Sequence, residues 1–188
     1  MIGAVLTVVW ANLWKSDLRV ADVRVGGNSV VADREILSLA NISKDQKLYG
    51  VDLLAAQKRV QQNAFIKSAA VNREAPNRIA INVIERVPIA AVVLDRIEYL
   101  DAEGFVLPPV RSENIFDVPV LTGTFQSSEV VPGKQIVRSD VREALAILAA
   151  AQDLGVEVYR RISEIHLEPG KDIMLYTAES GVPVIFGR

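Results

Sequence analysis

The sequence predicts an α+β protein: a β-α-α-β-β unit over residues 18–88, then a mixed, mostly antiparallel β unit with one main helix over residues 89–188. Three observations lead to this prediction. Short runs of alternating apolar residues recur along the chain, as in half-buried strands. Apolar residues at helical spacing follow Ser139 and stop at Gly155, as in one main helix. Pro88 separates the two halves.

The first unit is expected to open with a strand and a short helix. Between residues 18 and 25, apolar residues roughly alternate with charged ones. The Gly-Gly-Asn of residues 26–28 ends this strand, because glycine and asparagine tolerate positive φ. A helix is predicted over residues 33–40, with its apolar side chains on one face.

A second helix and two strands complete this unit. Asp52 is placed to cap the helix, because its carboxylate can accept hydrogen bonds from the free N–H groups of the first turn. Apolar residues then repeat at helical spacing up to Val60. The two strands are expected over Ile66–Arg73 and Ile79–Ile84, with a turn at residues 75–78 between them.

The second unit begins with a hairpin in which Asp101 and Gly104 supply the turn geometry. Ser139 is the expected N-cap of the main helix, and Gly155 is expected to end the helix in the left-handed conformation. The tail is predicted to form three strands, over Ile162–Leu167, Ile173–Thr177 and Val182–Phe186.

Composition narrows the classes of function. The chain has 188 residues, half of them hydrophobic (50%), which is enough to bury one core, or two small ones. There are 21 Lys and Arg against 23 Asp and Glu, so no basic field favours nucleic acid. The chain has no cysteine, which excludes disulfides, thiolate metal sites and cysteine nucleophiles.

The first 17 residues allow two interpretations. Residues 2–14 carry no charge, but the run is shorter than the ~20 apolar residues that a spanning helix needs. It is either the start of a globular domain or the outer half of a membrane anchor. Trp10 and Trp14 beside Lys15 suit the aromatic and basic collar of a membrane interface.

The sequence contains no convincing set of catalytic or metal-binding residues. His166 is the only histidine, and on a strand it shares a face with Glu164 and Glu168. A zinc site needs three or four ligands, and no other nitrogen or sulfur ligand is nearby in the sequence, so a solvated polar face is expected. Residues 43–45 (Ser-Lys-Asp) and the serines at 127 and 128 lack the motifs of a nucleophile site. We therefore expect no enzyme activity, cofactor, metal or small-molecule substrate.

Two hypotheses remain open for the adjacent charges Glu85 and Arg86. Arg86 could bind a partner carboxylate through its guanidinium fork. Alternatively, the pair makes a structural contact between the two units.

Several segments carry a resemblance to a known family. The segment VRVGGNSVVADREIL, then residues 65–73 and residues 76–90, resemble a POTRA domain. Residues 99–108 (YLDAEGFVLP) and 118–123 (VPVLTG) resemble elements of the FtsQ/DivIB family of cell-division proteins. The ordered set covers residues 18–188 and is more specific than any single motif.

The resemblance implies an arrangement and a function. The family has a single-pass anchor in the cytoplasmic membrane, then a POTRA domain and a β-domain on the periplasmic side, at the division septum. It implies a non-enzymatic scaffold that links early and late division proteins. Residues 1–17 would then be a partial anchor, and residues 89–188 a C-terminally shortened β-domain, because relatives often continue past residue 188. The alternative is a POTRA module of an outer-membrane assembly or secretion system.

Binding is expected to use strand addition at a sheet edge, where unpaired N–H and C=O groups accept a partner strand. Two edges are predicted: the strand Ile79–Ile84, and the C-terminal hairpin, in which Pro183 cannot donate a ladder bond. By resemblance, the partners are other bitopic division proteins, similar to FtsB and FtsL. The expected partner-binding residues are Ile79, Ile81, Glu85, Arg86, Ile173, Leu175, Tyr176, Val184, Ile185 and Phe186.

Overall fold

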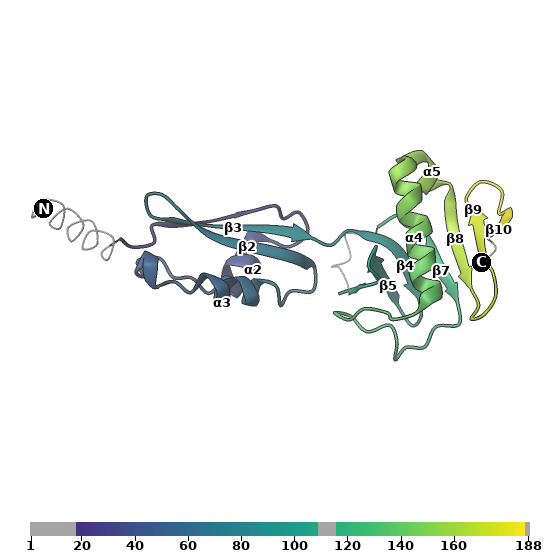
Figure 1. The fold of residues 1–188 in the computed structure, drawn as a ribbon, viewed down its shortest axis with the longest axis horizontal. Coiled ribbons are helices and arrows are strands. Elements are labelled where there is room, and N and C mark those ends of the chain that lie inside the picture. The colour runs from purple at the N-terminus through teal and green to yellow at the C-terminus, as the bar shows by residue number, and fades with distance from the viewer. Residues whose placement is uncertain (1–17, 109–115, 187–188) are drawn as a thin grey trace, which may run out of the picture. The chain divides into compact units, whose positions relative to one another are not determined.

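The computed structural model describes residues 18–108 and 116–186, so the expected anchor in residues 1–17 lies outside the described residues. The contacts divide the chain between Glu85 and Arg86 into two compact units. We call residues 18–85 unit 1 and the described residues from 86 onward unit 2. The predicted α+β class is confirmed, because both units combine helices with sheets (Figure 1).

Unit 1 follows the predicted β-α-α-β-β order. Its elements are β1 (Asp22–Gly26), α2 (Asp33–Ala40), the 3₁₀ turn η1 (Leu48–Gly50), α3 (Leu53–Val60), β2 (Ile66–Glu74) and β3 (Arg78–Glu85).

The three strands of unit 1 form one sheet in the order β1-β3-β2. β1 pairs with β3 in parallel, and β2 pairs with β3 antiparallel. Helices α2 and α3 lie on one side of this sheet (Figure 1). The core between them is built from side chains at strand and helix spacing, among them Ile36, Val60 and Ile81.

Local chemistry explains where the helices of unit 1 begin. The Asp52 carboxylate accepts a hydrogen bond from the Ala55 N–H at 2.9 Å, which confirms the predicted cap of α3. α2 has no side-chain cap, and its C-terminal Asn41 adopts the left-handed conformation. Gly27 has a φ of +86°, as expected for the turn after β1.

Unit 2 contains seven strands and two helices within its described residues. They are β4 (Pro88–Val93), β5 (Ile97–Asp101), β6 (Val106–Leu107), β7 (Val120–Gly123), α4 (Ser139–Leu154), α5 (Val156–Arg160), β8 (Ile162–Leu167), β9 (Ile173–Thr177) and β10 (Pro183–Phe186).

The strands of unit 2 form a single sheet in the order β10-β9-β8-β7-β4-β5-β6. The pairs β4–β7 and β7–β8 are parallel. The remaining four pairs are antiparallel, so the sheet is mixed and mostly antiparallel, as predicted.

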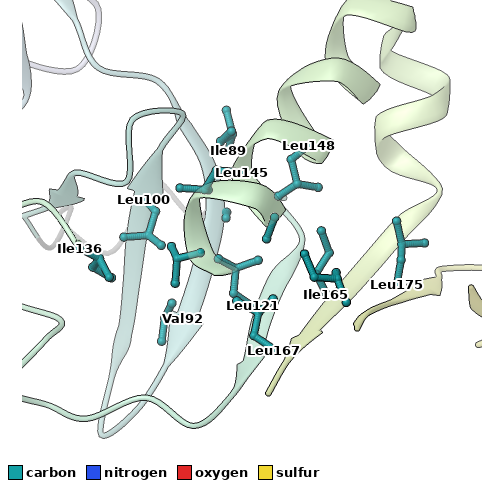
Figure 2. Close-up of a cluster of buried hydrophobic side chains, with 14 of the residues drawn as sticks. Ile89, Val92, Leu100, Leu121, Ile136, Leu145, Leu148, Ile165, Leu167 and Leu175 are labelled. Atoms are coloured by element: carbon teal, nitrogen blue, oxygen red, sulfur yellow. The ribbon is translucent and has the colours of Figure 1, made fainter. Parts of the chain in front are cut away.

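Helix α4 packs on one face of this sheet and contributes most of the helical residues in the core. In Figure 2, Leu145 and Leu148 of α4 lie against Leu121 and Ile165 of the central strands. All four side chains are at most 1% exposed. The central strands therefore carry the hydrophobic contacts that hold unit 2 together, and the outer strand β10 lies away from them.

Three local predictions for unit 2 require correction. Ser139 is the first residue of α4 and not its cap, and the preceding Arg138 makes no side-chain capping bond. Gly155 ends α4 with φ 133° and ψ 153°, which glycine favours but which is not the left-handed helical conformation. The short helix α5 was not predicted; it is anchored by Tyr159, whose hydroxyl donates to the Ile89 carbonyl at 2.9 Å.

Candidate partner-binding edge

Strand β10 forms one edge of the unit 2 sheet. Within the described part of the chain it pairs only with β9, so its other side has no ladder partner there. All four of its residues are exposed. The strand carries no charged side chain, although charges commonly protect free edges from other strands. The predicted edge at the C-terminal hairpin is confirmed.

The hydrogen bonds of the hairpin fix which backbone groups of β10 point outward. The Thr177 N–H donates to the Val182 carbonyl at 3.4 Å, so these opposed residues form a hydrogen-bonded pair. Bonded and non-bonded pairs alternate along an antiparallel ladder. Pro183 and Ile185 are therefore in non-bonded pairs, and their backbone groups face away from β9.

This alternation explains why proline is tolerated in β10. The N–H that Pro183 lacks would point away from β9, so its absence costs the ladder no bond. Within Pro183–Phe186, the outward groups are then the carbonyls of Pro183 and Ile185 and one N–H group, that of Ile185. A partner strand would form its complete hydrogen-bonded pair at Ile185.

Both faces of β10 are apolar. Val184 and Phe186 lie opposite Leu175 and Ile173, so they extend the core face of the sheet beyond its buried region. Val184 and Phe186 are each 42% exposed, whereas Ile185, on the opposite face, is 67% exposed. A strand added here would bury apolar side chains on both of its faces.

The expected C-terminal binding residues therefore fall into two groups. Ile173 and Leu175 point into the core, where they are 4% and 7% exposed. Tyr176 is half-buried, and its carbonyl accepts a hydrogen bond from the Ser163 hydroxyl. The side chains that a partner could reach directly are Val184, Ile185 and Phe186.

The predicted edge at Ile79–Ile84 is wrong. β3 is the central strand of its sheet, with β1 on one side and β2 on the other. Ile79 and Ile81 are fully buried against the helices. The edges of this sheet are β1 and β2, so a strand cannot add to β3.

Glu85 is held inside unit 1. Its carboxylate accepts hydrogen bonds from the N–H groups of Ser29, Val30 and Val31 at 2.7–3.2 Å, and from the Ser29 hydroxyl at 2.8 Å. Burial by itself would raise the pKa of the Glu85 carboxyl, but these hydrogen bonds outweigh burial and hold the pKa below its ordinary value. Glu85 thus ties the end of β3 to the loop after β1.

Arg86 is held inside unit 2. Its Nη1 donates to Asp101 at 2.5 Å and to Glu103 at 3.0 Å, and its guanidinium lies 3.9 Å from the ring centre of Phe105. The side chain is 13% exposed. Glu85 and Arg86 therefore each bind residues of their own unit, although they are neighbours in sequence.

The polar face around His166 is a hydrogen-bonded surface. The Thr122 hydroxyl donates to Glu164 at 2.5 Å and lies 2.9 Å from His166 Nδ1. His166 Nε2 is 3.6 Å from Glu168, which also binds Lys171. Glu164 and His166 alternate with the buried Ile165 and Leu167, so they lie on the face of the sheet away from the core. Among the described residues, no group of acidic and histidine side chains could hold a metal ion.

Two arginine clusters that stabilise the units were missed by the sequence analysis. Arg73 donates to the carbonyls of Leu48 and Val51 at 2.9 and 2.8 Å, which satisfies the ends of η1. Arg138, the residue before α4, binds Asp140 in the first turn of that helix. Nothing in the local pattern distinguishes these arginines from solvent-facing ones.

Comparison with known families matches each unit. A model described as POTRA domain, FtsQ-type, matches residues 18–86. A second, described as Cell division protein FtsQ/DivIB, C-terminal, matches residues 91–188. No helix in the described ranges, 18–108 and 116–186, is both long and apolar enough to span a bilayer.

Proteins similar to this chain are found in several bacteria. The cell division protein FtsQ of Syntrophotalea carbinolica is 32% identical over the whole of this chain, which covers 67% of that relative. FtsQ of Geotalea daltonii is 30% identical over 82% of the chain and 56% of its own length. FtsQ of Geobacter sp. (strain M21) is 29% identical over 91% of the chain and 62% of its own length. The chain thus spans roughly three-fifths of these relatives.

Proposed function

Because the chain belongs to the FtsQ/DivIB family of cell-division proteins, we propose that it acts as a non-enzymatic scaffold of the bacterial division complex. It links early and late division proteins at the septum through contacts outside the cytoplasmic membrane. Residues 1–17 supply part of a single-pass anchor in this proposal. Confinement to the membrane surface raises the effective concentration of other anchored proteins, so weak contacts suffice.

The free edge of β10 is the observation that best supports a binding role. Its uncharged strand presents the outward N–H and C=O groups of Ile185 and apolar side chains on both faces. The proposed partners are bitopic division proteins similar to FtsB and FtsL, which add a strand to this edge. Backbone hydrogen bonds then provide affinity, and alternate side chains select the partner.

Localisation tests the scaffold role. The full-length protein, fused to a fluorescent tag that folds outside the cytoplasm, is expected to form a band at the septum of dividing cells. Its depletion is expected to give filaments. Uniform or outer-membrane fluorescence, together with normal division after depletion, would exclude the scaffold and favour a POTRA module of a secretion or assembly system.

The mode of binding has a separate test at Ile185. Ile185→Pro removes the one outward N–H group of Pro183–Phe186 but no bond to β9, so hairpin stability should change little. Affinity for a soluble FtsB-like partner should fall by about fivefold, which corresponds to one lost hydrogen bond. Ile185→Val keeps the N–H and serves as the control. Equal affinity of the two variants would rule out pairing at this edge while leaving the septal role intact.

A further inference from the structure

The first described residues of unit 1 are hydrogen-bonded to the loop between α2 and α3. The Leu48 N–H donates to the Leu18 carbonyl at 2.8 Å, and the Arg19 guanidinium donates to the Asp45 carbonyl at 2.7 Å. We call residues 44–49 the entry loop, because the chain enters unit 1 beside them. The start of the described chain is therefore fixed to one point on the surface of unit 1.

The chain before Leu18 limits how far the entry loop can lie from a membrane. In the proposed function, residues 1–17 supply part of an anchor, with Trp14 at the membrane interface. Leu18 follows Trp14 by four residues, and an extended chain advances at most about 3.6 Å per residue. Leu18 thus lies within about 14 Å of that interface, whatever path residues 15–17 take. This bound limits the distance but leaves the orientation of unit 1 open.

The entry loop and Arg19 present excess positive charge to solvent. Arg19, Lys44 and Lys47 have exposed side chains, and the acidic residue among them is Asp45. Three positive charges less one negative charge leave a net charge of +2. Next to an anionic membrane surface, each excess basic residue strengthens binding by about fivefold.

The charges on the strands at this end of unit 1 offset one another. The turn between β2 and β3 lies at the same end (Figure 1). Arg78 follows this turn and is in register with Asp22 of β1 and Glu74 of β2. Asp22 also pairs with Arg24 at 3.4 Å. The excess positive charge is therefore concentrated on the entry loop and Arg19.

An exposed aromatic ring stands beside these charges. Tyr49 is 52% exposed, and the guanidinium of Arg73 lies 5.5 Å from its ring centre. Arg73 also donates to the Leu48 and Val51 carbonyls, so the arginine that contacts the ring is itself fixed to the loop. Tyrosine is enriched at membrane interfaces, because its ring is apolar and its hydroxyl is polar. The entry loop therefore combines the two residue types of a membrane-interface collar.

From these observations we propose that the entry loop and Arg19 dock on the anionic phospholipid headgroups of the cytoplasmic membrane. The inference rests on the proposed anchor, which keeps the loop within reach of the surface. Arg19, Lys44 and Lys47 pair with headgroup phosphates, and Tyr49 enters the interface. β1 and β3 both run away from this end, so docking turns the far end of β3, at Glu85, away from the bilayer.

Fluorescence quenching in vesicles tests the docking. Residues 1–188 contain no cysteine, so one introduced cysteine can carry a fluorophore at a chosen position. Ser43→Cys places the fluorophore at an exposed position next to the entry loop. Gln62→Cys places it at an exposed position just before β2, whose opposite end pairs with Arg78 near the loop. The full-length protein is reconstituted into vesicles of equal parts phosphatidylglycerol and phosphatidylcholine, with a nitroxide quencher on a small share of the headgroups.

Docking predicts that the nitroxide quenches a fluorophore at position 43 more strongly than one at position 62. Lys44→Gln with Lys47→Gln removes the net charge, so the ratio of docked to free loop should fall by about 25-fold, and quenching at position 43 should fall with it. Arg34→Gln with Lys58→Gln is the matched control, because it removes two exposed positive charges from α2 and α3 and should leave the quenching unchanged. In vesicles of pure phosphatidylcholine the difference between the two positions should shrink.

Two outcomes overturn the docking alone. One is quenching at position 43 that is no stronger than at position 62, and the other is equal quenching at position 43 in the charge variant and its matched control. Flotation with vesicles of pure phosphatidylcholine tests the anchor separately. A protein that does not float with them lacks the proposed anchor, and the docking falls with it. A protein that floats but fails the quenching test keeps the anchor and the scaffold role.

Discussion

Arg138 binds Asp140 through two parallel hydrogen bonds, Nε to Oδ1 at 3.1 Å and Nη2 to Oδ2 at 2.6 Å. The pair stands directly before and inside the first turn of α4, where the guanidinium also lies 4.8 Å from the ring centre of Phe125. The Arg138 hydrogen bonds hold the pKa of the Asp140 carboxyl below its ordinary value. A side chain that is not a conventional cap thus fixes the start of the main helix.

Removing the charge of Asp140 should destabilise unit 2. Asp140→Asn breaks one arm of the fork and leaves the Arg138 guanidinium, 15% exposed, without its main carboxylate. We expect a loss of about 2 kcal/mol in the free energy of unfolding, measured by urea denaturation. Asp153→Asn, at the exposed far end of α4, is the control and should change stability by less than about 0.5 kcal/mol. Equal losses in the two variants would contradict the role of the fork.

Unit 1 should lose stability in acid through Glu85. The folded-state pKa of Glu85 lies below its ordinary value of 4.5, so the stabilisation is complete above that value and is lost as pH falls through the folded pKa. Glu85→Gln should therefore lower stability at pH 7 by about 1.5 kcal/mol. Glu85→Gln should also weaken the pH dependence of the stability of unit 1, measured by amide hydrogen exchange of its residues. If the slope of unit 1 stability against pH is the same in Glu85→Gln and the wild type between pH 6 and about pH 3, the Glu85 carboxylate does not stabilise unit 1 in the way described.

Gly123 should tolerate no side chain. A Cβ there would lie 1.8 Å from the Leu167 carbonyl oxygen of the neighbouring strand, and φ is +119°. Gly123→Ala should cost about 3 kcal/mol or more, because β7 and β8 must separate. Gly170→Ala adds a Cβ at φ +81° with nothing within 4 Å, so it isolates the backbone strain, about 1–2 kcal/mol. Thermal unfolding of both variants separates the steric clash from the strain.

The Tyr159 hydroxyl should resist ionisation. Burial raises the pKa of Tyr159 to about 12, and its hydroxyl donates to the Ile89 carbonyl. An ultraviolet titration of the folded wild type should therefore show one fewer ionised tyrosine below pH 11 than a titration of the same protein unfolded in urea. Tyr159→Phe should lower the free energy of unfolding by about 1 kcal/mol. It should also remove the late step of the titration, which is the ionisation of Tyr159 above pH 11. Tyr176→Phe, which alters a half-buried ring, should leave the late step in place.

Local patterns located most strands but could not order them. The tail strands were predicted within a residue of their observed ends, because alternation and turn residues are properties of short segments. The edge at Ile79–Ile84 was wrong because β1 pairs with β3 in parallel, across more than 50 residues of chain (Val23 with Ile79). Such pairing depends on tertiary packing and leaves no local signal. α5 was missed because five residues are too few to show a helical period.

The sequence predicted the position of the candidate edge but not which of its residues are buried. Pro183 correctly indicated an edge, because the missing N–H is a property of the residue itself. The division of the expected strip into buried Ile173 and exposed Ile185 required the register of β9 with β10. The contacts of Glu85 with residues 29–31 also join distant segments, so the sequence left its role open.

The parallel pairs at the centre of unit 2 have a consequence for folding during synthesis. β4 pairs with β7 and β7 with β8, so the middle of the sheet can close only after the ribosome has passed Leu167. Until then the apolar hairpin of β4 and β5 has no neighbour on one side, and non-local pairing is slow. Unit 1, by contrast, has all its strands once Glu85 is made. Unit 1 can therefore complete its sheet while the β4–β5 hairpin of unit 2 still exposes an unpaired strand edge.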